Sequence, residues 1–215
     1  MEHGVYLRSG STLFQARAAY SRSLESSPES EVCIALCVAA FEGFLNEIPL
    51  VVRPFDFSND EKAVALSEAL LEAEEARLSP VSKYRFAKFV LTDRFPRKGD
   101  QDVQRLTAIF KLRNSMLHLK PDPIFNLDPA IQESQSENKP PPEVALLIAE
   151  KVIERPIKFS GSWRTLVSTA TVAGWTYENI VATMKSFTAV APSPWVKQQL
   201  ARLTEHLPDS PKNAA

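Results

Sequence analysis

The sequence predicts an all-α fold, an up-and-down helical bundle with additional helices. Apolar residues recur at helical spacing along most of the 215 residues. Ser-Pro pairs and other capping residues mark the starts of several segments, and no segment shows the alternation of a half-buried strand. With 44% hydrophobic and 24% charged residues, the chain has the composition of an ordinary globular protein and is long enough to bury a substantial core.

The first two helices are expected over Thr12–Ser26 and Pro28–Ile48. Ser27 precedes Pro28 as a cap precedes the first helical position. The second helix is apolar on most sides, which is typical of a helix at the centre of a bundle. In this interpretation only Glu42 and Asn46 interrupt it, four residues apart on one stripe.

Six further helices complete the predicted bundle, the first of them opened by the capping-box run Ser58–Glu61. The stretch 121–142 contains six prolines among polar residues and is expected to be a long, irregular connection. Gly174 lies inside an expected helix, where glycine costs stability unless it permits close packing against a neighbour. Residues 1–190 are assigned to one helical domain, and residues 191–215 to an amphipathic helix and a polar tail. The expected helices cover 61–78, 80–92, 103–119, 143–154, 162–187 and 194–207.

Charge is unevenly distributed along a chain whose net charge is only −1. Residues 56–75 contain seven acids and one base, a net charge of −6, whereas residues 79–120 contain ten bases and three acids, a net charge of +7. The whole molecule therefore sets up no field that attracts nucleic acid, but the block 79–120 is locally positive. An ordinary solvated surface is the alternative explanation of such a block.

The two cysteines, Cys33 and Cys37, lie four residues apart in the apolar central helix. They are expected to be small core residues in a reducing compartment rather than a disulfide or a metal pair. The N-terminus has no signal-peptide pattern, and no apolar stretch is interpreted as long and charge-free enough to span a bilayer. We therefore expect a cytoplasmic location.

The basic block contains the strongest candidate for a catalytic site. Arg113 and Asn114 are followed by His118 near the end of a helix that Pro121 terminates. A guanidinium presents a fixed fork of donors to a phosphate, and an imidazole changes charge near neutral pH. The histidine could take the proton of a ribose 2′-hydroxyl while the arginine neutralises charge on the phosphate, which would leave a cyclic phosphate and spare DNA. No cluster of His, Cys and carboxylates has metal-ligand spacing, so neither a metal nor another cofactor is expected.

Helical geometry favours a site shared by two molecules. On a regular helix Arg113 and His118 would be about 140° apart around the axis and roughly 7.5 Å apart along it, so one chain would not aim both side chains at one phosphate unless the helix ends before His118. Phe110, Asn114 and His118 share a stripe, and pairing of this stripe with its copy across a two-fold axis would bring two arginines and two histidines into one cleft. The structural alternative is a histidine in a last helical turn that interacts with free carbonyls and the helix dipole.

This combination of residues resembles the HEPN superfamily of helical domains, which includes many toxin and antiviral ribonucleases. The family motif is an arginine, a polar residue next to it and a histidine after four to six positions, which matches Arg113, Asn114 and His118. The run 40–46, with its Glu and Asn on an apolar helix, and the run 169–175, with small residues beside a tryptophan, resemble two further helices of that family. The resemblance covers residues 29–187.

The resemblance implies a homodimer with its active site at the interface and metal-independent endoribonuclease activity on RNA. Arg113 and His118 would be the catalytic pair, and Asn114 would be their polar companion. A role as a toxin or phage-defence effector, with an antitoxin or regulatory protein as partner, would follow. Lys120 stands where some members that are paired with a nucleotidyltransferase antitoxin carry a modified tyrosine, so the sequence departs from the family there.

Four neighbouring residues are secondary candidates for the same site. Lys111 and Lys120 flank the motif and could contact phosphates, or they could be ordinary exposed lysines. Glu42 and Asn46 could orient the motif histidine or line the cleft, or they could pair structurally with the motif arginine or a lysine.

Two other classes of function remain open. A non-catalytic HEPN-like module would bind a nucleotide, RNA or a protein through the same cleft. An adaptor would bind a basic partner through the acidic helix at 61–75. Under each hypothesis Trp163, Trp175 and Trp195 are expected to pack in the core rather than to stack on bases.

Overall fold

The structure confirms the all-α prediction. This computed structural model describes residues 7–53, 60–117, 125–126, 140–155, 160–205 and 207. Two strands of two residues each, β1 (Phe125–Asn126) and β2 (Ser160–Gly161), pair antiparallel and are too short to change the fold class. The helices in the described residues are α1 (Ser9–Ser23), α2 (Pro28–Val52), α3 (Glu61–Glu75), α4 (Pro80–Thr92), α5 (Gln101–Leu117), α7 (Pro142–Ala149), α8 (Trp163–Val167), α9 (Ala170–Ala189) and α10 (Pro194–Thr204).

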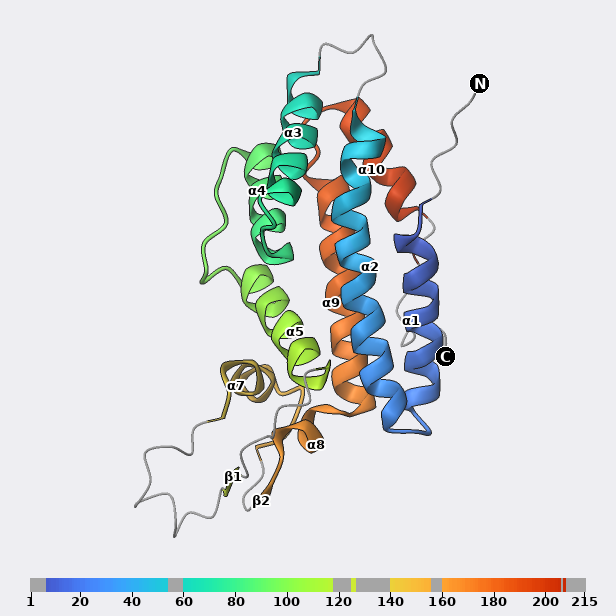
Figure 1. The fold of residues 1–215 in the computed structure, drawn as a ribbon, viewed down its shortest axis with the longest axis vertical. Coiled ribbons are helices and arrows are strands. Elements are labelled where there is room, and N and C mark those ends of the chain that lie inside the picture. The colour runs from blue at the N-terminus through green and yellow to red at the C-terminus, as the bar shows by residue number, and fades with distance from the viewer. Residues whose placement is uncertain are drawn as a thin grey trace.

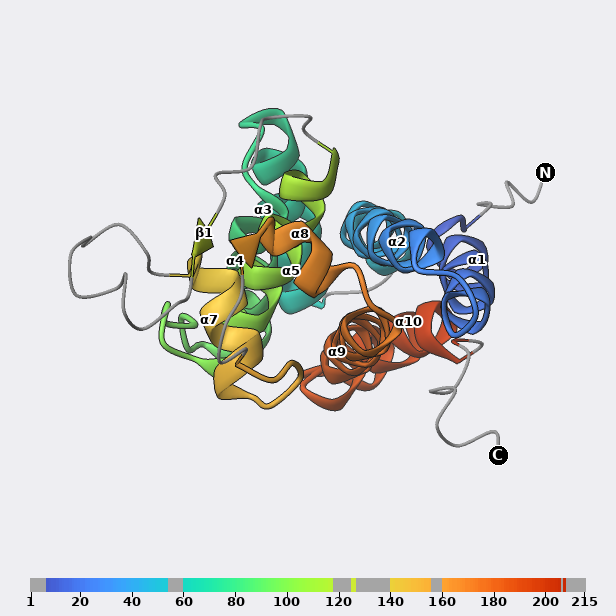
Figure 2. The same cartoon turned by 90° about the horizontal axis from the view of Figure 1, so that it is seen from below.

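The helices form two groups that lie side by side. In Figure 1, α2 and α9 run together up the middle of the molecule, with α1 and α10 on one flank and α3, α4 and α5 on the other. Figure 2 shows the same division from below, with α7 and α8 beside α5. The rings of Phe44 and Tyr84 both meet the ring of Phe187 edge-on, at centroid separations of 5.3 and 5.7 Å. These aromatic contacts join α2, α4 and α9 into one core.

The central position of α2 explains its apolar sequence. By length and composition alone it is long and apolar enough to cross a membrane, so the expectation that no stretch would be was wrong on that count. More than half of its most apolar window is buried by the surrounding helices, as in a core helix. Cys33 and Cys37 are buried in α2 as free thiols, and burial, together with the neighbouring Cys33 thiol, raises the pKa of Cys37. Such a thiol is inert packing material.

Capping residues begin several helices where the sequence places them. The hydroxyl of Ser79 accepts a hydrogen bond from a first-turn backbone N–H of α4 at 3.2 Å, and that of Ser193 does the same for α10 at 3.1 Å. In α3 the cap is Asp60, whose carboxylate accepts from a first-turn N–H at 3.0 Å. The proposed capping-box residue Ser58 lies outside the described residues.

The single helix predicted over 162–187 is two helices, which corrects that prediction. The chain leaves α8 at Ser168 and restarts at Thr169, whose extended backbone and hydroxyl cap the first turn of α9. Ser27, predicted as a side-chain cap of α2, makes no capping bond there. Its hydroxyl instead donates to the carbonyl oxygen of Ser168 at 2.8 Å, and so ties the start of α2 to this break.

A buried acid on α2 caps a different helix. Glu47 is 7% exposed, and its Oε1 accepts hydrogen bonds from the backbone N–H groups of Arg8 and Ser9, at 2.5 and 2.9 Å. The Ser9 hydroxyl donates to the other carboxylate oxygen. A carboxylate at a helix N-terminus satisfies free donors and complements the helix dipole. Glu47 therefore also interrupts the apolar sequence of α2. Its position is explained by the N-terminus of α1, which its carboxylate caps.

Gly174 permits close packing of α9 against α1, as its position in the sequence indicated. A Cβ atom at this residue would lie 2.8 Å from Cε2 of Tyr20 and 3.1 Å from its Cζ and hydroxyl oxygen. Because the Tyr20 ring is itself buried, at 8% exposure, it has little freedom to move aside. Glycine therefore fits here where alanine would collide with the ring.

Candidate functional site

The motif arginine lies in an ion pair between α5 and α2. Nη2 of Arg113 donates to Oε1 of Glu42 at 2.8 Å, and both side chains are partly exposed. This is the structural pairing that the sequence left open for Glu42. A guanidinium carries five N–H donors, and the pair with Glu42 engages one nitrogen, so further donors of Arg113 can reach an anion.

Arg113 lines a small pocket between the first turns of α2 and the end of α5. The pocket has a volume of about 320 Å³, and its two charged lining residues are Glu31 and Arg113. Two of the apolar lining residues, Val32 and Leu117, are 43% and 57% exposed. The apolar lining consists of Pro28, Val32, Ala35, Leu36, Met116 and Leu117.

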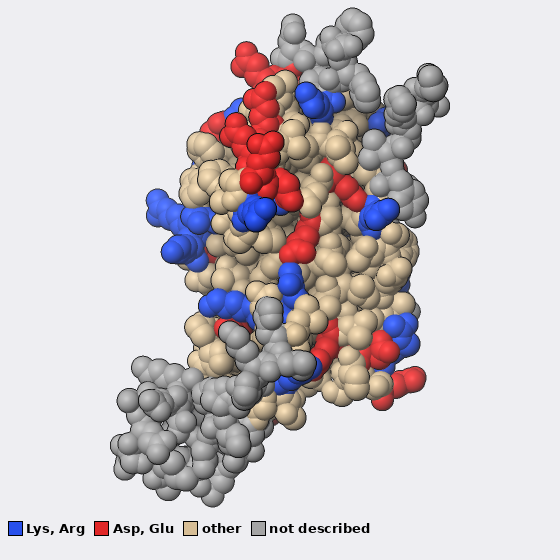
Figure 3. Space-filling view, viewed as in Figure 1, with Lys and Arg blue, Asp and Glu red and all other residues tan. Residues whose placement is uncertain are grey.

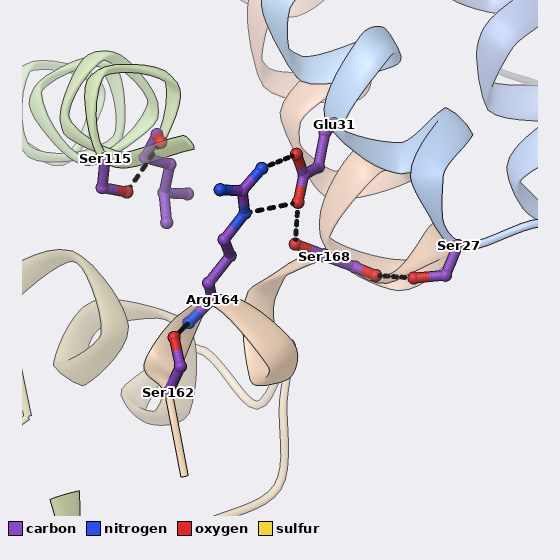
Figure 4. A network of polar contacts seen from close by, with 7 residues as sticks. Ser27, Glu31, Ser115, Ser162, Arg164 and Ser168 are labelled. Carbon is purple, nitrogen blue, oxygen red and sulfur yellow. Dashed lines mark hydrogen bonds and ion pairs between the residues drawn. The ribbon is translucent and has the colours of Figure 1, made fainter. Parts of the chain in front are cut away.

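Glu31, which lines this pocket, belongs to a polar network with Arg164 and Ser168 (Figure 4). Nε of Arg164 donates to Oε1 of Glu31 at 2.8 Å, and Nη2 of the same arginine reaches the other carboxylate oxygen. The Ser168 hydroxyl donates to Glu31 Oε1 at 2.7 Å. Hydrogen bonds from Arg164 lower the pKa of Glu31 despite the opposing effect of partial burial, and Ser168 adds to this shift. Glu31 is thereby held ionised beside the pocket.

Asn46, the second polar residue predicted on α2, contacts a lysine. Nζ of Lys83 donates to Oδ1 of Asn46 at 3.1 Å and also pairs with Glu74 of α3. Burial lowers the pKa of Lys83, and the nearby charge of Glu42 partly offsets that effect. The polar stripe on α2 thus receives one cation from α5 and one from α4.

The other residues that the sequence predicted for the site lie in different environments. Asn114 is exposed, as the proposed site requires. Phe110, expected on the stripe that meets a second copy, is instead 8% exposed and packs edge-on against Phe41 at 6.3 Å, so it belongs to the core. Lys111 is exposed and faces a different groove, between α4, α5 and α7. His118 and Lys120 lie outside the described residues.

A second polar network, centred on the carboxylate of Glu150, joins α5, α7 and α9. Glu150 accepts hydrogen bonds from Nε of Arg105 at 2.8 Å and from the indole Nε1 of Trp175 at 2.9 Å. Burial alone would raise the pKa of Glu150, but the bonds from Arg105 and Trp175 outweigh it and lower the pKa. The structure confirms core packing for Trp163 and Trp175, which are 5% and 9% exposed.

Sequence reasoning missed Glu31 and Arg164 beside the motif arginine. They are 133 positions apart, and a lone acid in a first turn and a lone arginine in a short helix give no signal that they meet. The pairing of Glu42 with Arg113, 71 positions apart, was one of the alternatives considered only because both residues were already candidates for the proposed site. In the part of the chain that the structure describes, no group of three or more His, Cys, Asp or Glu side chains is placed to hold a metal ion.

Comparisons with models of known protein families, with curated protein sequences and with solved structures found no match. The fold and the site thus define an all-α bundle with a solvent-accessible arginine–glutamate pair at one end. Its likeness to HEPN domains stays a prediction.

Acid should weaken the fold through Glu31 and Glu150. Their pKa values are lowered in the folded state, so the stability that they contribute is present above the unfolded glutamate value of about 4.3 and is lost as the pH falls through the folded pKa values. We expect Glu31→Gln to cost about 1 kcal/mol at pH 7, or roughly 2–4 °C in Tm, and to cost less at pH 3. Thermal unfolding followed by circular dichroism at both pH values measures this. Glu25→Gln, at an exposed acid that forms no ion pair with another described residue, is the matched control, and an equal loss at pH 7 and pH 3 would contradict the assignment.

Proposed function

We propose that this protein is a metal-independent endoribonuclease of HEPN type. The observation that supports the proposal most is the place of Arg113, which lines an open pocket together with Leu117, the residue directly before His118 in the chain. A phosphate at this pocket would meet a guanidinium with donors to spare, beside the segment that supplies an imidazole. Asn114 is exposed next to it as a further polar group.

The proposed reaction uses the ribose itself as nucleophile. His118 takes the proton of the 2′-hydroxyl, and the 2′-oxygen attacks the adjacent phosphorus in line. Arg113 neutralises the charge that builds up on the non-bridging oxygens. The P–O bond to the 5′-oxygen of the next nucleotide breaks, that oxygen takes up a proton, and the first product ends in a 2′,3′-cyclic phosphate. DNA lacks the nucleophile and is not cut.

We place the active site between two copies of the chain. Val32 and Leu117 expose large apolar surfaces around Arg113, and exposed apolar surface beside a functional group is typical of an interface. A two-fold contact through this surface would bring the two motif segments together, and each copy would supply one arginine and one histidine. The buried position of Phe110 means that this contact is centred on the Arg113–Leu117 side of α5 rather than on the stripe of Phe110.

Leu117→Glu should separate the two copies, because it places a charge in the centre of the proposed contact. Sedimentation equilibrium should give a dimer for the wild type and a monomer for the variant, and RNA cleavage should fall with the dimer. Leu50→Glu is the matched control, since Leu50 is 54% exposed at the other end of α2. A wild type that stays monomeric at high micromolar concentration, or a Leu117→Glu protein that stays dimeric, would remove this interface.

The nuclease proposal is tested by incubating the purified protein in EDTA with RNA and with DNA of the same sequence. Degradation of the RNA alone is the expected result. Intact RNA, or cleavage that needs an added divalent cation, would contradict the proposal. We propose further that such an activity serves as a cytoplasmic toxin or antiviral effector, controlled by an antitoxin or another regulatory protein.

A further inference from the structure

An opening larger than the Arg113 pocket lies elsewhere in the described part of the molecule. It is a groove of about 770 Å³ between the start of α4, the outer face of α5 and α7, which we call the α4–α5–α7 groove. Along α5 it runs from Val103 to Lys111, about 12 Å at the helical rise per residue. Its volume is within the range of ligand sites, and its length exceeds the size of one phosphate. An extended ligand would fit it better than a single small ion.

The groove is lined by cations that the fold does not neutralise. Arg85, Lys98 and Lys111 line it, and none of them forms an ion pair with a carboxylate of the described residues. Nearby bases behave differently, since Lys83 pairs with Glu74 and Arg105 pairs with Glu150. The acid that lines the groove is Glu143, on α7.

The positive surface continues onto the loop between α4 and α5. Arg94 and Arg97 are exposed there, and neither forms an ion pair with a described carboxylate. Figure 3 shows Lys and Arg side chains gathered over this loop, on the left of the view, and acidic side chains gathered over α3. Opposite charges are thus separated on one face of the molecule, and the positive part lies next to the groove.

Three exposed aromatic rings stand beside these cations. Phe86, Phe89 and Phe95 are 39%, 43% and 42% exposed, and the first two meet Phe95 edge-on at 5.8 and 5.9 Å. The guanidinium of Arg85 lies 4.5 Å from the centre of the Phe95 ring, and its Nε donates to the carbonyl oxygen of Pro96 at 2.9 Å. Arg85 therefore belongs to both the groove and the aromatic cluster, and it joins them into one preformed surface.

This combination is specific to one class of ligand. A protein partner could cover the exposed phenylalanines. It would also have to present a row of acids that matches the three groove cations. A single-stranded nucleic acid satisfies both, because its phosphates follow a positive groove and its bases stack on aromatic side chains. Double-stranded nucleic acid presents no free base faces to such rings.

We propose that the α4–α5–α7 groove and the rings of Phe86 and Phe89 bind single-stranded RNA. The inference deepens the proposed function, since it assigns the substrate strand a path that ends at Lys111, seven residues before His118 in the chain. Phosphates lie against Arg85, Lys98 and Lys111. Unpaired bases stack on the exposed phenylalanines, which restricts the substrate to unpaired segments of RNA.

Fluorescence anisotropy of a labelled 2′-O-methyl RNA 12-mer tests the inference independently of cleavage, because this strand has no 2′-hydroxyl to attack. The logarithm of the affinity should fall with the logarithm of the salt concentration with a slope of about −2 for three phosphate contacts on a single strand. Lys98→Glu/Lys111→Glu should weaken binding at least about tenfold and flatten the slope to about −0.7, the value for one remaining contact. Phe86→Leu/Phe89→Leu, which keeps apolar packing on Phe95 but removes the flat rings, should weaken it at least about fivefold.

Matched controls lie on the opposite flank of the molecule. Arg202→Glu/Lys197→Glu on α10, and Phe14→Leu on α1, change exposed residues of the same types and should leave the affinity of the 12-mer unchanged. All variants should keep the wild-type circular dichroism spectrum and Tm. The inference is overturned if the wild type does not bind the strand, if it binds a duplex equally well, or if groove and control variants bind alike. Capture of a protein through these residues without strand binding would also overturn it.

The two proposals fail separately. Binding of the 2′-O-methyl strand through the groove without cleavage of unmodified RNA would refute the nuclease and leave the groove standing. Cleavage of unmodified RNA at the wild-type rate and KM by Lys98→Glu/Lys111→Glu would refute the groove alone.

Discussion

His118→Ala should lower the rate of RNA cleavage by about 10²–10⁴, because it removes the proposed general base for the 2′-hydroxyl proton. Single-turnover cleavage of a labelled RNA in EDTA measures this rate without a contribution from product release. His206→Ala is a control of the same residue type near the C-terminus, and it should cleave at the wild-type rate.

Arg113→Ala should lower the same rate by about 10²–10³, since it removes charge stabilisation from the transition state. Arg113→Lys should restore only part of the loss, because an ammonium is a point charge and lacks the planar fork. Arg202→Ala, on α10, is the arginine control. If the wild type and the His118 and Arg113 variants behave alike in EDTA, the catalytic assignment is wrong.

One result of these assays would favour the non-catalytic alternative. A protein that binds RNA tightly, keeps that affinity in His118→Ala and yields no cleavage product would be a binding module with the same fold. A partner that depends on the acids of α3 and not on Arg113 would instead support the adaptor hypothesis.

Gly174→Ala should destabilise the fold by about 1–2 kcal/mol. Overpacking of a well-packed core costs about 1–3 kcal/mol, and the better helix propensity of alanine returns up to about 1 kcal/mol. The collision is with the Tyr20 ring, 2.8 Å from the added Cβ. Denaturant unfolding followed by circular dichroism measures the change, and Tm should fall by roughly 2–8 °C.

The Tyr20→Leu background isolates the cause of this loss. Leucine removes the ring that an added Cβ would meet, so Gly174→Ala should be neutral or mildly stabilising in that background. Gly10→Ala, at a helical glycine where an added Cβ meets nothing within 4 Å, is the control for propensity alone. An equal cost of Gly174→Ala with and without Tyr20 would mean that the ring is not the obstacle.

Local sequence patterns predicted most of the fold, because apolar spacing and capping residues each lie within a single helix. The apolar run of α2 placed that helix at the centre, and Ser79 and Ser193 marked helix starts through bonds to their own first turns. The break between α8 and α9 at Ser168 was not predicted, because Thr169 is equally compatible with a position inside a helix. Thr169 caps α9 because its backbone is extended there. Hydrogen bonds of the preceding Ser168 with Ser27 and Glu31 hold this part of the backbone in place.

The candidate site was predictable only in part, for a related reason. The motif pointed to Arg113, and Glu42 was identified as a partner because a half-buried carboxylate needs one. The Glu31–Arg164 pair depends on how α8 packs against α2, and the α4–α5–α7 groove depends on how α4, α5 and α7 pack together. Residue patterns within a single helix do not indicate these contacts. The cations of the groove come from the basic block at 79–120 that the charge count identified, although that count predicted no groove.

The proposed nuclease depends on a guanidinium and an imidazole that together cleave an RNA strand at a ribose without a metal. A DNA strand with a single embedded ribonucleotide, incubated with the wild type in EDTA and followed by mass spectrometry, tests it most directly. We expect one cut, on the 3′ side of that ribonucleotide, with a 2′,3′-cyclic phosphate on one product and a 5′-hydroxyl on the other, and no cut with Arg113→Ala or His118→Ala. Cuts at deoxynucleotides, 5′-phosphate ends, or the same products from the variants would contradict it.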